Sequence, residues 1–203
     1  MKKLFLLAAM IAAPMAFAQD MDVVKGDFGF LAGQKEINVE FDYSKLTMMK
    51  DKKTEAQYMD ERAEDLNKKA KGNGEVWKKK WAGAKEGIWQ PKFIELVNTV
   101  LSKDKKDVSF QEGLSNAKYT VMVEAVWIFP GWDVAMMKQP AKVSLTYKFV
   151  ETNNKGNVLL EIKSEEAPGD QYGSNFSNES RIGEGFAKSG KSLAKLLLKK
   201  AYK

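Results

Sequence analysis

The clearest pattern in the chain is a regular alternation of apolar and polar side chains in its second half. Apolar residues occupy every second position over 119–129, 143–149 and 158–162. Because successive side chains of a strand point to opposite faces, this spacing predicts three strands with one buried face and one wetter face. Turn-forming sequences at 129–132 (Phe-Pro-Gly-Trp) and 153–156 (Asn-Asn-Lys-Gly) end the first strand and join the last two. The three strands are therefore expected to form a meander.

The first half of the chain predicts one further strand and two helical regions. Residues 37–43 alternate in the same way as the meander strands. Thr54 and Gln57 have the spacing of a capping box, which predicts a helix that begins there. A second helical region starts near Glu75, and Pro91 is expected to break it.

The end of the chain predicts a loop followed by a helix. Residues 164–180 are rich in Gly, Asn, Ser and Asp, which is typical of a long surface loop, and apolar residues from Ile182 to Leu197 recur at helical spacing. The whole pattern predicts a single α+β domain over 19–203. We expect an antiparallel-dominated sheet with a three-strand meander and helices packed on one face.

The first eighteen residues have the three parts of a secretory signal peptide. Met1-Lys2-Lys3 is a short basic start, an apolar run follows, and the segment ends in Ala16-Phe17-Ala18. The apolar run is too short to span a bilayer, which needs roughly 20 residues. We therefore expect cleavage after Ala18 and a periplasmic or secreted protein, with no membrane span once the signal is removed.

The charge of the chain is mildly positive and is carried almost entirely by lysine. The formal net charge is +6, and Arg62 and Arg181 are the only arginines. Arginine is the residue that reads bases and phosphates with a two-pronged fork, so nucleic-acid binding is not expected. The sequence contains no cysteine and no histidine. Disulfides, thiolate or imidazole metal sites and Ser-His-Asp or Cys-His catalysis are thereby excluded, and we expect no cofactor.

One segment matches a nucleotide-binding motif letter for letter. Residues Gly185–Ser192 satisfy G-x-x-x-x-G-K-S, the phosphate-cradling P-loop. A working P-loop follows a buried strand and opens an α/β sheet, whereas this segment follows a polar loop and lies close to the last residue of the sequence. We interpret it as part of the last helix, with glycines that allow close packing.

Carboxylates are the remaining groups that could perform hydrolytic chemistry without histidine. No pair of them is distinguished by the sequence, so a solvated surface explains them as well. They cluster in two places, the predicted first helix and the predicted loop: Asp60, Glu61, Glu64, Asp65, Glu165, Glu166 and Asp170.

The tryptophans are the residue class that we single out as candidate contacts. Exposed tryptophans stack on sugar rings or anchor protein partners. Trp127 and Trp132 flank the Pro-Gly turn, and Trp89 lies near lysines of the second helical region. The alternative is that Trp77, Trp81 and Trp127 cover the sheet as core residues. Trp132 is the strongest candidate because turns lie at the surface.

Several short segments carry a resemblance to known proteins. The Pro-Gly turn of the meander, Gln139-Pro140-Ala141, the run 168–173 and the closing Gly-Lys-Ser-Leu helix resemble a family of small exported Bacteroidetes-type proteins with no assigned activity. The order of elements also resembles periplasmic auxiliary domains of envelope transport and secretion lipoproteins. This chain lacks the lipidated cysteine of those lipoproteins. Neither resemblance implies a catalytic residue.

These observations lead to two functional hypotheses. The first is a non-enzymatic exported protein that binds a protein partner or a glycan in the cell envelope, with Trp132, Trp127 and Trp89 as candidate contacts. The alternative is a carboxylate-based hydrolase that acts on envelope polysaccharide, which requires two carboxyl groups to converge in one cleft.

The signal-peptide assignment has a direct test. We expect N-terminal sequencing of the exported protein to begin at Gln19, because Ala16 and Ala18 provide the small-x-small cleavage site. Recovery of Met1 on the exported chain would contradict the assignment.

Overall fold

The computed structural model describes residues 21–134, 137–169 and 177–203. The predicted signal peptide and Asp170 lie outside these residues. The elements follow in this order: β1 (Met21–Gly26), η1 (Gly29–Leu31), β2 (Glu36–Asp42), β3 (Thr47–Met48), β4 (Lys53–Thr54), α1 (Glu55–Lys69), α2 (Asn73–Ala84), η2 (Lys85–Trp89), α3 (Gln90–Lys103), β5 (Ser109–Gln111), β6 (Tyr119–Phe129), β7 (Trp132–Val134), β8 (Met137–Gln139), β9 (Ala141–Glu151), β10 (Asn154–Gly169) and α4 (Asn178–Lys200).

The strands form one large mixed sheet and a small separate hairpin, β7–β8. The order in the large sheet is β1-β10-β9-β6-β2-β5, with β3 beside β6 and β4 beside β3. Strands β6, β9 and β10 form the predicted meander. The expectation of an antiparallel-dominated sheet is wrong, because β2 runs parallel to both β5 and β6, and β3 runs parallel to β6. The helices α1 to α3 lie in the chain between β2 and β6, and a crossover of this kind brings the chain back in the same direction.

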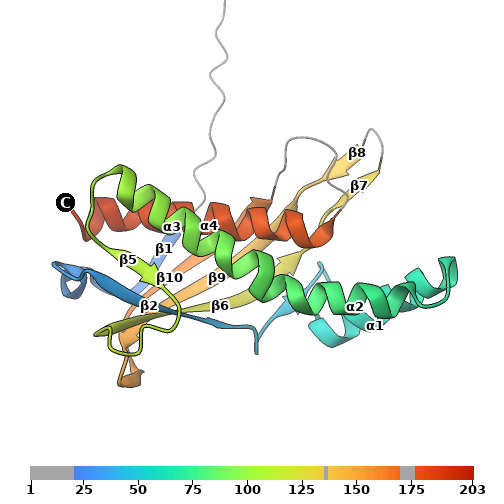
Figure 1. Ribbon diagram of the computed structural model, residues 1–203, viewed down its shortest axis with the longest axis horizontal. Helices are drawn as coiled ribbons and strands as arrows, with labels where there is room; N and C mark the ends of the chain where they lie inside the picture. Colours follow the sequence, from blue (N-terminus) through green and yellow to red (C-terminus); the bar gives the residue numbers. More distant parts are fainter. Residues whose placement is uncertain (1–20, 135–136, 170–176) are drawn as a thin grey trace, which may run out of the picture.

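The helices α3 and α4 lie side by side across one face of the sheet, as Figure 1 shows. Their apolar faces and the facing strand residues share one core, which includes Phe93, Val97, Phe186 and Leu193 with Tyr147 of β9. Helices α1 and α2 extend beyond one end of the sheet, the end at which the β7–β8 hairpin also lies (Figure 1). Within the described residues, no helix combines the length and the apolar character needed to cross a membrane.

Pro91 does not break the second helical region, contrary to the expectation from sequence. The helix runs on from α2 through the π-helical segment η2 into α3, and Pro91 occupies the first turn of α3. The Gln90 N–H donates to the Lys85 carbonyl five residues earlier. In an α-helix, a proline ring clashes with the carbonyl four residues before it. The wider π turn moves that carbonyl away, so the helix continues.

A β-bulge in β6 reverses the faces predicted for its last residues. Ala125 pairs with Leu145, but Trp127 pairs with Ser144, so the register shifts by one residue between them. Trp127 and Phe129 therefore lie on the face opposite α3 and α4, and Ile128 enters the core in their place. A regular alternation cannot reveal a single inserted residue, because both faces receive apolar side chains.

The region 164–180 is not a loop throughout. Strand β10 continues to Gly169, and α4 begins at Asn178. The register of β10 against β9 is irregular between Ser164 and Ala167, where Glu166 adopts a positive φ of 49°. This irregularity interrupts the alternation by which the strand would have been recognised.

The P-loop-like segment lies inside α4, which confirms its interpretation as helix. Backbone N–H groups inside a helix are already hydrogen-bonded and cannot cradle a phosphate. A Cβ on Gly185 would lie 2.6 Å from Val143 Cγ2, and a Cβ on Gly190 would lie 2.6 Å from the Phe93 carbonyl oxygen. These glycines allow α4 to approach the sheet and α3 closely.

Replacing Gly190 tests this close approach. We expect Gly190→Ala to lower the free energy of unfolding by about 1–3 kcal/mol, because the new methyl group meets the Phe93 backbone. The matched control is Gly83→Ala on α2, where a Cβ meets nothing within 4 Å. That change should raise stability by up to about 1 kcal/mol through helix propensity. Denaturant unfolding measures both, and equal effects of the two substitutions would contradict the packing role.

A second test concerns the buried hydroxyl of Tyr147, which shares hydrogen bonds with Ser189, itself bonded to Ser164. Burial raises the pKa of Tyr147, although these hydrogen bonds oppose the rise. The unfolded chain loses this proton near pH ~10, whereas the folded protein keeps it to higher pH. Stability is therefore complete below that pH and falls as the pH rises above it.

We expect Tyr147→Phe to flatten the loss of unfolding free energy between about pH 9 and 11, by up to ~1.4 kcal/mol per pH unit. At neutral pH the variant should lose about 1 kcal/mol, the value of the hydrogen bond removed. Denaturant unfolding across this pH range measures both quantities. Parallel pH profiles for the two proteins would show that the Tyr147 hydroxyl ionises equally in both states.

Candidate functional site

A cleft of about 560 Å³ opens at the end of the sheet where four segments meet. Helix α1, the β3–β4 hairpin, the turn between β6 and β7 and the first turn of α4 form its walls. Both arginines of the chain, Arg62 and Arg181, line it. We call it the arginine cleft. Cationic side chains outnumber acidic ones on its walls, since Lys53 and Lys69 join the arginines against Glu61 and Asp65.

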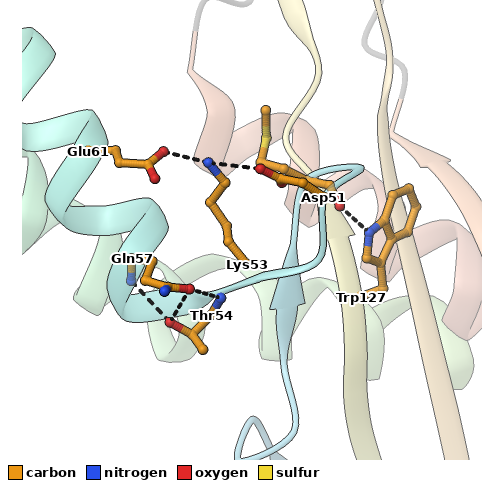
Figure 2. Close-up of polar contacts among 7 residues, drawn as sticks. Asp51, Lys53, Thr54, Gln57, Glu61 and Trp127 are labelled. Atoms are coloured by element: carbon orange, nitrogen blue, oxygen red, sulfur yellow. Dashed lines mark hydrogen bonds and ion pairs between the residues drawn. The ribbon is translucent and has the colours of Figure 1, made fainter.

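Helix α1 supplies the polar wall of the arginine cleft. Tyr58, Glu61, Arg62, Asp65 and Lys69 line it, and their spacing of three or four residues places them on one helix face. The start of α1 is fixed by the predicted capping box, which the structure confirms. In that box the Gln57 N–H donates to the Thr54 hydroxyl, and the Thr54 N–H donates to the Gln57 side chain (Figure 2).

The β3–β4 hairpin closes one side of the cleft and is tied to two elements. Lys53 lies between Glu61 of α1, at 2.5 Å, and Asp51, at 3.3 Å (Figure 2). The hydrogen bond to Glu61 is the main cause that raises the pKa of Lys53. On the other side of the hairpin, the Trp127 indole N–H donates to the Met49 carbonyl at 2.7 Å. The hairpin is thereby held between α1 and β6.

Arg181 fixes the turn that forms the opposite wall. Its Nε and Nη2 atoms both lie 3.4 Å from the Pro130 carbonyl oxygen, and Nη2 also donates to the Asn178 side chain. The next residue, Gly131, has a φ of 67°, and a Cβ there would lie 2.3 Å from the Gln139 carbonyl oxygen. The turn therefore requires glycine at this position. Trp132 follows directly and lies at the cleft.

Arg62 is held differently from Arg181. It makes no hydrogen bond or ion pair with any residue that the structure describes, and its Nε atom is buried without a partner. Tyr58 lies near it: burial raises the pKa of the Tyr58 hydroxyl, and the charge of Arg62 opposes this rise. Asn178 contacts the same hydroxyl at 3.5 Å. Tyr58 thus joins α1 to the first turn of α4 at the base of the cleft.

The structure does not bring the three candidate tryptophans together. Trp132 is 41% exposed and lines the arginine cleft, where its indole N–H donates to Gln139. Trp127 lines a separate hollow of about 460 Å³ on the other face of the sheet, stacked on Phe129. Trp89 is fully buried in the core and donates to the Glu179 carbonyl. With no exposed surface, Trp89 offers nothing to a partner.

The carboxylates form no buried catalytic pair within the described part of the chain. Glu61 and Asp65 both line the arginine cleft, but their side chains are 61% and 62% exposed. Glu165 and Glu166 line the hollow beside Trp127 and are exposed. Nor do the described residues include a cluster of three or more acidic side chains able to hold a metal ion.

Sequence reasoning noted the two arginines only to argue against nucleic-acid binding. Their scarcity was the informative signal, because the chain has 33 cationic residues and just two of them are arginine. The separation of Arg62 and Arg181 in the sequence gives no indication that they share a cleft. Their meeting depends on the contact between α1 and the start of α4.

Comparisons with known proteins assign no family. No protein-family model matches the chain, and no curated protein matches it. Among solved structures, the PelC dodecamer from Paraburkholderia phytofirmans is similar over 85% of this chain and 97% of its own, with 11% identity and a TM-score of 0.38. A variant of the same dodecamer covers 86% and 96%, with 10% identity and a TM-score of 0.38. Similarities this weak assign neither a function nor an assembly.

Proposed function

We propose that this protein is a non-enzymatic, exported binding protein of the cell envelope and that the arginine cleft holds its ligand or partner. The observation that carries the proposal is the composition of the cleft. An exposed tryptophan and both arginines of the chain converge there from segments far apart in the sequence. Tryptophan and arginine are the residues most enriched at the energetic centres of binding sites.

The shape of the cleft supports a ligand of moderate size. Its volume of about 560 Å³ falls within the range of roughly 300–1,000 Å³ that is typical of small-molecule sites. Trp132 offers a flat apolar face that stacks on a sugar ring, and the surrounding polar groups fix orientation. The export of the protein rests on the basic, apolar and small-x-small segments of residues 1–18.

The alternative of a carboxylate-based hydrolase has weaker support. Such an enzyme needs one carboxyl group kept protonated by burial and a second held at a defined distance across the substrate. Glu61 and Asp65 share the cleft, but Glu61 is paired with Lys53 and both side chains are exposed. Binding without chemistry is the function that the geometry favours.

Replacing Trp132 tests the proposal. The exported protein is offered envelope extract and a glycan panel, and the affinity for whatever binds is then measured for each variant. We expect Trp132→Ala to weaken binding by at least about tenfold, or ~1.4 kcal/mol, because the stacking face is lost. Val76→Ala is the matched control, since Val76 is an exposed apolar residue on α2 outside the cleft.

Two outcomes would count against the proposal. The first is that the wild-type protein binds nothing specifically from the extract or the panel. The second is that Trp132→Ala binds as tightly as the Val76→Ala control, which would place any binding site elsewhere on the surface.

A further inference from the structure

We infer that Arg62 is the anchor for an oxyanion, a carboxylate or phosphate group, carried by the sugar ligand of the arginine cleft. This inference rests on the proposed function for the location of the site and adds the chemical class of the ligand. It depends on the contacts of Arg62 itself, on the contacts of the acids around it and on the contrast with Arg181.

No residue that the structure describes hydrogen-bonds to the guanidinium of Arg62. Its Nε is buried without a hydrogen-bond partner. The two terminal nitrogens have no partner among the described residues either, yet they remain accessible, because they are not among the buried unpartnered atoms. A buried N–H without a partner is costly, and the cost is greater for a charged group. Since Arg62 lines the arginine cleft, its accessible terminal nitrogens offer donors to a ligand there.

Two of the acids around Arg62 are held by lysines. Glu61 pairs with Lys53 at 2.5 Å, and Asp65 lies 3.4 Å from Lys68. Glu179, which is buried and influences Tyr58, accepts a hydrogen bond from Ser177 and forms no ion pair with Arg62. No described carboxylate neutralises Arg62 within ion-pair distance.

Arg181 shows what an arginine with a structural role looks like in the same cleft. It is 6% exposed and bonds to the Pro130 carbonyl and the Asn178 side chain. These contacts direct its donors into the fold. The two arginines therefore have different roles. Arg181 fixes the turn, and Arg62 presents its planar guanidinium to a ligand in the cleft.

The chemistry of this fork selects the ligand. A guanidinium binds carboxylate and phosphate oxygens through two parallel hydrogen bonds, which a neutral hydroxyl cannot match in strength. Trp132 lines the same cleft and offers a face for a ring. A sugar ring that bears a carboxylate or a phosphate satisfies both groups at once.

The scarcity of arginine makes a residue-specific test available. An arginine-directed dicarbonyl reagent such as phenylglyoxal modifies two side chains at most, and peptide mass spectrometry distinguishes Arg62 from Arg181. The probes are glucuronate, glucose 6-phosphate and neutral glucose, at matched ionic strength. We expect Arg62 to react faster than Arg181, because its terminal nitrogens are accessible and unpaired.

Protection by the probes decides the inference. We expect glucuronate or glucose 6-phosphate to slow modification of Arg62 by at least about tenfold at saturation, and glucose to leave the rate unchanged. Protection by glucuronate alone identifies a carboxylate ligand, and protection by glucose 6-phosphate alone identifies a phosphate ligand. Equal protection by glucose, or no protection by either anion, would overturn the inference.

Binding measurements on variants separate this inference from the proposed function. Calorimetry should show that Arg62→Gln abolishes the preference for the protecting anion over glucose, and that Arg62→Lys restores only part of it, because lysine lacks the fork. Lys199→Gln removes the same charge from an exposed position near the end of α4, outside the cleft, and should keep the preference within about twofold. If Trp132→Ala weakens binding but Arg62→Gln keeps the preference, the cleft binds a ligand and the role of Arg62 is wrong.

Discussion

The burial of Trp89 is the interaction on which the shape of the cleft depends. Its indole N–H donates to the Glu179 carbonyl at 2.8 Å, and its ring stacks on Phe186 with 5.7 Å between centroids. It also meets Trp81 edge-on at 5.2 Å. These contacts join the middle of the long helical run to the first turn of α4. A buried indole N–H requires an acceptor, so this hydrogen bond helps to fix the position of that turn.

The aromatic contacts continue from Trp89 to the cleft itself. Trp81 packs against Tyr58 of α1 at 5.3 Å, and Tyr58 lies at the base of the arginine cleft. The distance between Arg62 on α1 and Arg181 on α4 is therefore governed by a row of large rigid side chains. Trp89, proposed from sequence as a contact residue, is instead a positioning residue.

The sequence predicted the secondary structure correctly where it depends on neighbouring residues alone, as in strand alternation and helix capping. The meander follows from alternation, and the start of α1 follows from Thr54 and Gln57. Local rules failed where a single residue changes the phase, as at the bulge between Ala125 and Trp127. They also missed β1, an edge strand whose Val23 and Val24 are both exposed, so that no alternation marks it.

The arginine cleft was out of reach for a related reason. Its walls come from α1, the β3–β4 hairpin, the β6–β7 turn and α4, and these are placed by tertiary packing alone. The parallel pairing of β2 with β5 and β6 also depends on tertiary packing, because the chain passes through the helices before it returns to the sheet. Trp132 could be singled out because turn residues lie at the surface. The sequence around Arg62 and Arg181 contains no comparable feature that would indicate a binding site.

The number of residues in the π-helical segment η2 determines how α2 is rotated relative to α3, whatever side chains those residues carry. From Trp81 onward, buried residues along the run follow at intervals of three or four, except between Ala84 and Trp89, where the interval is five. Each residue turns a helix by about 100°, so the extra one sets the rotation of α2 relative to α3. A one-residue deletion within η2 would rotate α2, and α1 with it, about the axis of the long helical run relative to α3. The cleft would then change shape although every residue lining it was still present.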